Sequence, residues 1–267
     1  MAGYFETFNG DVLKANYVDP VYAAKSVLIP GLTTPADFKI NGQTAYYYDR
    51  TGLQVTNGPA GRVLELEETG YRRIDVPLTQ ALKFGGYIPG VAIATVSEDV
   101  VGTEAALAAN ATILEENQLV LSAMVTGGTA SKNTTASTKE TIYDNIVDDI
   151  AEFIETNKHA PVAIIVSPKA KALLQKSDAF VKGNANFEAN KAVIGEVAGL
   201  AVVDGLGMTG AEYIITDGNG YMHPHSLQKI ELFGDIPGRV NTMVLQGEWC
   251  YGSQVIKASR LLVKKSA

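Results

Sequence analysis

The stretch SEDVVGTEAALAANATILEENQLVLSAMVT, residues 97–126, predicts one long helix. Its apolar residues recur at three- and four-residue spacing, which places their side chains on one face of a helix. Ser97 can cap the first turn, and Gly127-Gly128 supplies a stop. The predicted buried stripe consists of Val100, Leu107, Ala111, Leu114, Leu121 and Val125. At about 1.5 Å per residue such a helix is roughly 40 Å long, so we expect it to be the spine of the molecule.

The composition around this helix limits the classes of protein that the chain can belong to. With 267 residues, 46% of them hydrophobic and 19% charged, the chain can bury a sizeable core. The net charge of -7 provides no basic surface for nucleic acid. A single cysteine, Cys250, excludes an internal disulfide and a multi-cysteine metal site. No apolar run of about 18 residues and no signal-peptide pattern is present, so we expect a soluble, unexported protein without membrane contact.

Residues 1–36 have the character of an N-terminal arm. They contain Tyr4, Phe5 and Phe8 but no sustained helical or strand period, and several prolines interrupt them. An irregular segment this apolar must be covered to remain in solution. It can lie on its own domain or on a neighbouring subunit, and the sequence leaves both possibilities open.

Residues 37–75 predict a β-hairpin. Short β runs are separated by the turn signals Asn41-Gly42 and Asn57-Gly58. The charged positions of this hairpin carry both signs: Arg50, Arg62, Glu65, Glu67, Glu68, Arg72 and Arg73. Solvated strand faces also have this pattern. A two-stranded ribbon is marginal in water, so either its own core or another subunit must provide a surface for it.

The second half of the chain mixes helices and strands without regular βαβ alternation, which predicts an α+β architecture. A capping box at Ser137–Glu140 predicts a second amphipathic helix that ends near Asn157 to Pro161. We expect its acidic residues to form a solvated face: Asp144, Asp148, Asp149, Glu152 and Glu155. Residues 162–166 predict a buried strand, followed by a helix capped by Ser167 with Pro168 at its first position.

Three apparent chemical motifs do not have the context that their chemistry requires. Residues 205–210 fit G-x-G-x-x-G, but a β-like run follows where a dinucleotide site needs a helix. His223-Pro224-His225 is interpreted as a surface turn rather than a metal site. Cys250 and Ser167 lack a partner base at a recognisable spacing. We therefore predict no catalytic, cofactor-binding or metal-binding residues, and no enzyme.

The order of these segments resembles that of a major capsid protein of tailed phages of the Hong Kong 97 type. The resemblance covers essentially the whole chain and depends on order and spacing. It is carried by VPLTQALKFGGYIPGVAIATVSED (76–99) ahead of the long helix, VAIIVSPKAKALLQ (162–175), GEVAGLAVVD (195–204) and MVLQGEWCYGSQVIKASRLLV (243–263).

This resemblance implies an organisation and a function. It divides the chain into an N-terminal arm (1–36), an extended loop (37–75), a peripheral domain (76–140 and 226–256) with the spine helix, and an axial domain (141–225 and 257–267). It implies self-assembly through pentameric and hexameric rings into an icosahedral shell around double-stranded DNA, without sequence-specific binding. The implied partners are a separate scaffolding protein and a portal, and the implied location is the virion, assembled in the host bacterial cytoplasm.

The predicted assembly contacts lie in the arm and the hairpin. They are Tyr4, Phe5, Phe8, Arg50, Arg62, Glu65, Glu67, Arg72 and Arg73. Two other interpretations remain open: an encapsulin-type nanocompartment, which resembles the same fold but encloses a cargo enzyme, and a soluble α+β enzyme with widely scattered site residues.

Overall fold

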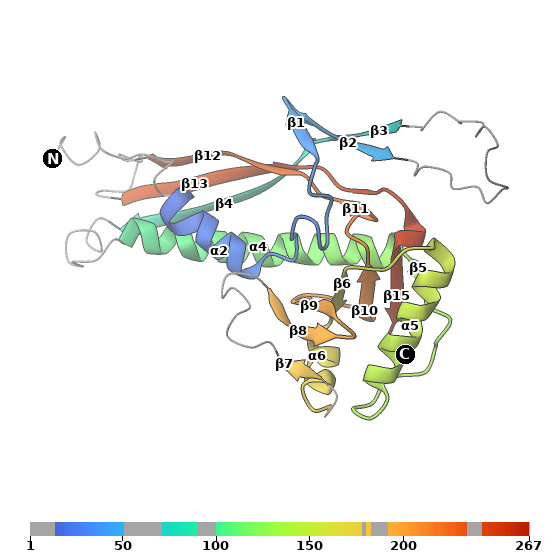
Figure 1. The fold of residues 1–267 in the computed structure, drawn as a ribbon. Coiled ribbons are helices and arrows are strands. Elements are labelled where there is room, and N and C mark those ends of the chain that lie inside the picture. The colour runs from blue at the N-terminus through green and yellow to red at the C-terminus, as the bar shows by residue number, and fades with distance from the viewer. Residues whose placement is uncertain are drawn as a thin grey trace.

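A single long helix organises the molecule. The computed structural model describes residues 14–50, 71–89, 100–177, 180–182, 192–233 and 242–266. Within them α4 (Val100–Gly127) runs for 28 residues, between a three-stranded sheet of long strands and a seven-stranded sheet (Figure 1). The backbone N–H of Gly128 donates to the carbonyl of Met124 at 2.9 Å, and the helix ends there. The predicted helix and its glycine stop are confirmed, whereas Ser97 lies outside the described residues.

The predicted buried stripe of α4 is mostly wrong. Of its six residues only Leu121 is buried, and Leu107 is 57% exposed. The residues that α4 buries are Gly102, Ala105, Ala109, Thr112, Ile113, Glu116, Asn117, Val120, Leu121 and Met124. The first half of the helix packs on the three-stranded sheet and the second half on the seven-stranded sheet. Because the covering elements change along its length, one helical period cannot describe the buried face.

The seven-stranded sheet forms the larger core. Its strand order is β5 (Thr129–Ala130), β15 (Leu261–Lys265), β10 (Ala211–Thr216), β6 (Ala163–Val166), β9 (Leu200–Asp204), β8 (Val193–Val197) and β7 (Val181–Lys182). Alternate residues of β10 point to opposite faces, as the period of two requires: Ile214 packs toward α4, and Tyr213 and Ile215 pack toward α5 (Ile142–Asn157) and α6 (Pro168–Leu174). Helices therefore cover both faces of this sheet.

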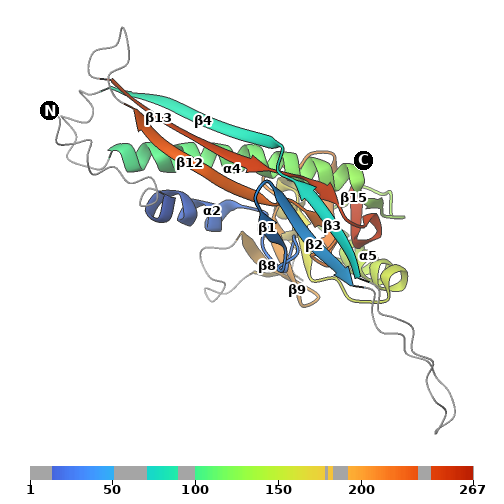
Figure 2. The ribbon, with the colours of Figure 1, turned by 90° about the horizontal axis from the view of Figure 1, so that it is seen from above.

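The three-stranded sheet is antiparallel and lies along the first half of α4 (Figure 2). Its order is β12 (His225–Phe233), β13 (Thr242–Tyr251) and β4 (Gln80–Pro89). Leu245 and Trp249 of β13 are buried against Ala105 and Ala109 of α4. The small alanine side chains let the strands approach the helix closely.

Two smaller sheets join these layers. The hairpin base consists of β1 (Lys39–Asn41), β2 (Thr44–Arg50) and β3 (Tyr71–Pro77), and Gly42 takes φ +61° in the turn between β1 and β2. The second sheet pairs β11 (Tyr221–Met222) with β14 (Gln254–Val255). A short 3-10 helix, η3 (Ala258–Arg260), then leads into β15.

The described part of the predicted arm contains helical structure that the sequence pattern did not predict. It forms a π-helical turn, η2 (Lys14–Val18), and a short helix, α2 (Asp19–Lys25). Pro20 is the second residue of α2, where its missing N–H breaks no helical hydrogen bond. The seven residues of α2 are too few to show a helical period in the sequence.

The two helix starts predicted in the second half have different outcomes. The α6 cap is confirmed, because Ser167 Oγ accepts the backbone N–H of Ala170 at 3.3 Å and Pro168 begins the helix. The capping box before α5 is wrong, because Thr141 occupies the cap position and makes no side-chain capping bond. Ser137 is instead buried, and its hydroxyl lies 2.5 Å from a carboxylate oxygen of Glu212 on β10.

Candidate subunit-interface surfaces

The described arm residues lie on their own chain. Asn117, fully buried on α4, accepts the backbone N–H of Val27 at 3.0 Å and donates to the carbonyl of Lys25 at 2.9 Å. Lys25 Nζ also donates to Asn110 Oδ1 at 2.7 Å. The sequence left open whether the arm packs on its own domain or on a neighbouring subunit. The described part of the arm, residues 14–36, packs on its own chain. Tyr4, Phe5 and Phe8 lie outside the described residues.

The base of the hairpin also rests on its own chain through one face. Ala45, Tyr47, Ile74 and Val76 are buried in a cluster with Met222. Polar contacts supplement this packing. Tyr47 donates its hydroxyl to Asn219 Oδ1 at 3.3 Å, and Arg260 lies 3.7 Å from Asp49 and 3.4 Å from Asp217. Burial is the largest cause that raises the pKa of Tyr47 above its ordinary value, so this hydroxyl remains a donor at neutral pH.

The opposite face of the hairpin base is open and has the chemistry of an interface. The ring centroids of Tyr46 and Tyr48 are 5.8 Å apart at 79°, and the Arg73 guanidinium lies 4.7 Å from the Tyr46 ring centroid. Arg73 Nε is 2.7 Å from Asp75 Oδ1, and this hydrogen bond is the largest cause that raises the pKa of Arg73. Tyr48 is 44% exposed. Tyrosine and arginine are enriched at the energetic centres of protein interfaces.

The predicted assembly residues of the hairpin fall into three groups. Arg72 and Arg73 are exposed on β3, and Arg73 belongs to the tyrosine patch just described. Arg50 is placed only by its backbone, which pairs with Tyr71 at the end of β2. Arg62, Glu65 and Glu67 lie outside the described residues. Their assembly role stays a prediction.

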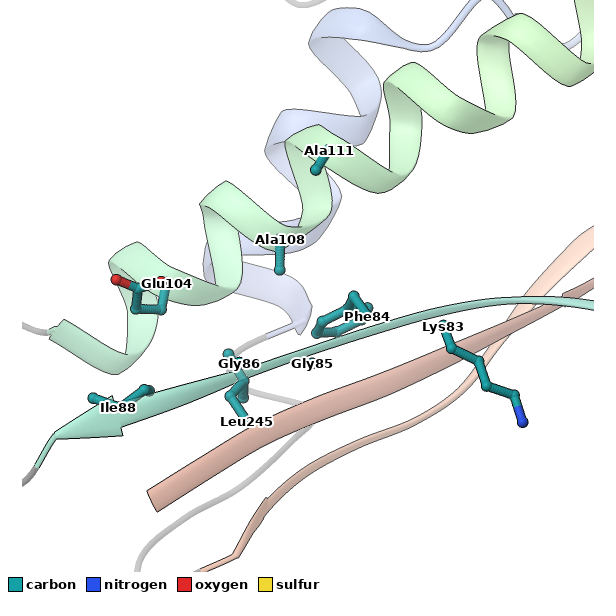
Figure 3. A pocket seen from close by; sticks show the side chains of 9 residues that line it. All are labelled: Lys83, Phe84, Gly85, Gly86, Ile88, Glu104, Ala108, Ala111 and Leu245. Atoms are coloured by element: carbon teal, nitrogen blue, oxygen red, sulfur yellow. The ribbon is translucent and has the colours of Figure 1, made fainter. Parts of the chain in front are cut away.

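A groove of about 400 Å³ opens between α4 and the edge of the three-stranded sheet (Figure 3). Its walls are largely apolar, and Glu104 and Lys83 stand at its two ends. The residues that line it are Lys83, Phe84, Gly85, Gly86, Ile88, Glu104, Ala108, Ala111 and Leu245. A Cβ built on Gly86 would meet no described atom within 4 Å. The groove exists because a glycine of β4 faces two alanines of α4.

A buried charged cluster fixes α4 where the chain passes from β11 into β12. His223 Nε2 and His225 Nδ1 lie 3.0 Å and 3.2 Å from the same oxygen, Oε1 of Glu116. The His223 ring stacks on Tyr251 at 4.9 Å between ring centroids. Burial raises the pKa of Glu116, but the hydrogen bonds from both histidines outweigh it and lower that pKa to about 2. The interpretation of residues 223–225 as a surface turn is therefore wrong, because His223 is buried and paired.

A second buried network holds α5 against β10, and it corrects the predicted acidic face. Asp149 is only 2% exposed, and it accepts the Tyr213 hydroxyl at 2.8 Å and the Ser131 hydroxyl at 2.8 Å. Burial is the largest cause that raises the pKa of Asp149. Asp144, Asp148 and Glu155 are exposed as predicted, and Glu152 is half-buried. Sequence period alone could not separate Asp149 from these neighbours, because its burial depends on a tyrosine 64 residues away.

The two buried networks join elements of the fold through side-chain hydrogen bonds and ion pairs. Within the described ranges, no three His, Cys, Asp or Glu side chains are arranged to hold a metal ion. The G-x-G-x-x-G run at 205–210 leads into β10 rather than a helix, so the reason for setting it aside is confirmed. None of the described helices has an apolar stretch long enough to cross a bilayer.

Comparison with solved structures decides the fold. The virus-like particle from Pyrococcus furiosus matches with a TM-score of 0.60 at 15% identity, over 99% of this chain and 100% of that chain. The capsid of the cyanophage P-SCSP1u matches with a TM-score of 0.59 at 15% identity, over 99% of this chain and 93% of that chain. A structure from Mycobacterium phage Che8 matches with a TM-score of 0.57 at 14% identity, over 84% of this chain and 85% of that chain. The chain has a Hong Kong 97-type capsid fold. No family model matches the sequence, and neither does any curated protein.

The capsid fold confirms the predicted α+β class. Proteins that share 14–15% sequence identity can have the same backbone architecture while their side-chain contacts differ.

Proposed function

We propose that this protein is the major capsid protein of a tailed double-stranded DNA phage and self-assembles into an icosahedral shell. The observation that carries the proposal is the capsid fold, shared over 99% of the chain with a cyanophage capsid structure. The exposed surfaces support it. An open face with two tyrosines and an arginine, and an apolar groove beside α4, are the kind of surface that further copies would cover.

In the proposed assembly, the seven-stranded sheet with α5 and α6 belongs to the axial domain, which meets its copies around five- and six-fold rings. The three-stranded sheet and α4 belong to the peripheral domain. The hairpin and the N-terminal arm reach adjacent subunits through Tyr4, Phe5, Phe8, Arg50, Arg62, Glu65, Glu67, Arg72 and Arg73. The shell would be built in the host cytoplasm with a scaffolding protein and a portal, and would form the capsid of the virion.

The charge of the chain is compatible with enclosing DNA. A net charge of -7 gives a wall that repels phosphate rather than binding it, which favours packing and release. Binding of the purified protein to DNA with a steep salt dependence would contradict this role.

A second candidate function is the shell of a nanocompartment that encloses a protein cargo. The match to the virus-like particle from Pyrococcus furiosus, over the whole of both chains, favours it. The contents of purified shells separate the two candidates, because a phage capsid packages DNA and a nanocompartment retains a cargo protein.

The deciding experiment is negative-stain electron microscopy with light scattering of the full chain, alone and with candidate scaffolding proteins. We expect closed shells or rings of five or six. The variant Arg73→Glu should reduce shell yield at least tenfold, because it removes the guanidinium from the tyrosine patch. Lys139→Glu is the matched control, since Lys139 is exposed and its ion pair among the described residues is with its sequence neighbour Glu140. A monodisperse monomer under every condition would contradict the proposal.

A further inference from the structure

Four side chains connect the seven-stranded sheet to the base of the hairpin through a row of ion pairs. His159 follows α5, Asp217 follows β10, Arg260 ends η3 and Asp49 lies on β2. Successive members of this row are 2.7 Å, 3.4 Å and 3.7 Å apart. We call these four residues the hairpin latch. Basic and acidic groups alternate along it, so a change of charge at one end alters the balance at the other.

The surroundings of His159 require a doubly protonated ring. Its Nδ1 lies 2.9 Å from the backbone carbonyl oxygen of Asn157, and its Nε2 lies 2.7 Å from Oδ2 of Asp217. A carbonyl oxygen and a carboxylate oxygen both accept hydrogen bonds, whereas a neutral imidazole has one N–H to donate. His159 therefore satisfies both acceptors only as an imidazolium. Its side chain is 40% exposed, so the ring can exchange protons with the solvent.

Both polar contacts of the hairpin base converge on Asp217, whose side chain is 5% exposed. Its Oδ1 accepts the backbone N–H of Asn219 at 2.9 Å, and Asn219 accepts the Tyr47 hydroxyl at 3.3 Å. Its Oδ2 faces His159 and Arg260 together, so two cations compete for one oxygen. His159 holds the shorter contact. Arg260 stays at 3.4 Å, beyond the distance of about 2.7 to 2.9 Å that is usual for a charge-assisted hydrogen bond.

Arg260 is divided between two carboxylates. Its Nε is buried and donates no hydrogen bond to any residue in the described part of the chain. Its Nη1 lies 3.7 Å from Oδ1 of Asp49 on the hairpin. A buried N–H without an acceptor costs free energy, so a short movement of the guanidinium toward Asp217 becomes favourable when the competing imidazolium charge is lost. That movement withdraws the guanidinium from Asp49.

We propose that the protonation state of His159 controls how firmly the hairpin base is anchored. While His159 is an imidazolium, Arg260 remains shared with Asp49. Once the ring is neutral, Arg260 moves toward Asp217 and the hairpin base loses this anchor. The result is the same whichever ring nitrogen keeps the remaining proton, because the positive charge beside Oδ2 is lost in both tautomers.

The other groups around the latch leave this role to the histidine. Burial is the largest cause that raises the pKa of Tyr47, with Asp37 and the latch carboxylates adding to it, so this hydroxyl keeps its proton at neutral pH. On α5 the His159 ring contacts the uncharged Phe153 ring edge-on, with 5.8 Å between centroids. Histidine is the side chain whose charge ordinarily changes between about pH 5 and pH 8. We therefore expect the hairpin to be held at the acid end of this range and released toward the alkaline end.

The test is hydrogen exchange of the full-length free chain, followed by mass spectrometry at about pH 5 and about pH 8. Rates are corrected for the intrinsic effect of pH on amide exchange. We expect peptides from β2 and β3 to exchange about three- to tenfold faster at the higher pH, which corresponds to the loss of one hydrogen bond. His159→Gln, which carries no charge at either pH, should remove this difference. A wild-type chain without the difference, or a His159→Gln chain that keeps it, would overturn the proposal.

Two further variants separate the latch from a general effect of charge. Lys158→Gln removes the positive charge next to His159 at an exposed position outside the latch, and it should keep the wild-type difference. Asp49→Asn retains His159 but removes the hairpin carboxylate, so it should exchange rapidly at both pH values. If His159→Gln lowers the melting temperature, Asp49→Asn decides, and a wild-type pH difference in that variant would refute the latch. All four latch residues belong to one chain, so the result does not depend on whether the chain forms shells.

Discussion

His223 and Glu116 form a buried pair: Nε2 of the imidazole lies 3.0 Å from Oε1 of the carboxylate, and the two side chains are 1% and 2% exposed. Glu116 sits on α4, and His223 lies between β11 and β12. The pair therefore ties the long helix to the point where the chain enters the three-stranded sheet. A buried carboxylate is tolerated only with partners that donate to it, so both members are needed together.

Removal of the imidazole should destabilise the fold strongly. In His223→Leu the carboxylate of Glu116 loses its buried donor, and the expected loss is about 3 to 5 kcal/mol of unfolding free energy. His225→Leu should cost less, because His225 is 30% exposed and water can replace its bond. Urea denaturation of both variants at neutral pH measures the difference. Equal and small losses in the two variants would show that the pair does not hold the junction.

The same carboxylate predicts acid sensitivity. The pKa of Glu116 is lowered from 4.5 to about 2, so its contribution to stability is complete above pH 4.5 and is lost as the pH falls through 2. A shift of this size corresponds to about 3 kcal/mol. Denaturation curves of the wild type and Glu116→Gln between pH 2 and pH 6 should converge at the acid end, because Gln cannot titrate. A constant difference between the two curves would refute the assignment.

Tyr213 provides a separate test of the network on α5. Tyr213→Phe removes the hydroxyl that donates to Asp149 at 2.8 Å and leaves a buried acceptor with one donor fewer. The expected loss is about 1 to 3 kcal/mol. Asp148→Asn on the exposed face of the same helix is the control and should change stability by less than about 0.5 kcal/mol. The measurement is the melting temperature of each variant. Equal changes in both variants would contradict the buried hydrogen bond between Tyr213 and Asp149.

Local signals predicted much of this fold. Three short signals act within a few residues, and the structure has all three as predicted. They are the helix cap at Ser167-Pro168, the turn at Asn41-Gly42 and the helix end at Gly127-Gly128. Order and spacing along the chain then indicated the capsid fold.

What the sequence could not provide depends on contacts between distant segments. Glu116 and His223 are 107 residues apart, and neither position has a neighbour in the sequence that marks it as buried. Leu107 has the spacing of a core residue but is exposed, because no described element covers that side of α4. The groove likewise involves Gly86 and Ala108, two residues with little or no side chain. The space that they leave between them depends on a strand and a helix facing each other, which the sequence does not show.

The last prediction compares two glycines with opposite surroundings. A Cβ at Gly252 would clash with the carbonyl oxygen of Pro77, so a side chain there forces the turn after β13 away from the end of β3. Gly252→Ala should cost about 1 to 3 kcal/mol through this clash. Gly86→Ala meets open space and should be neutral or slightly stabilising, because alanine restricts the unfolded chain. Melting temperatures of the two variants, measured side by side, should therefore move in different directions or by clearly different amounts. A fall of similar size in both would show that the contact with Pro77 does not determine the cost at Gly252.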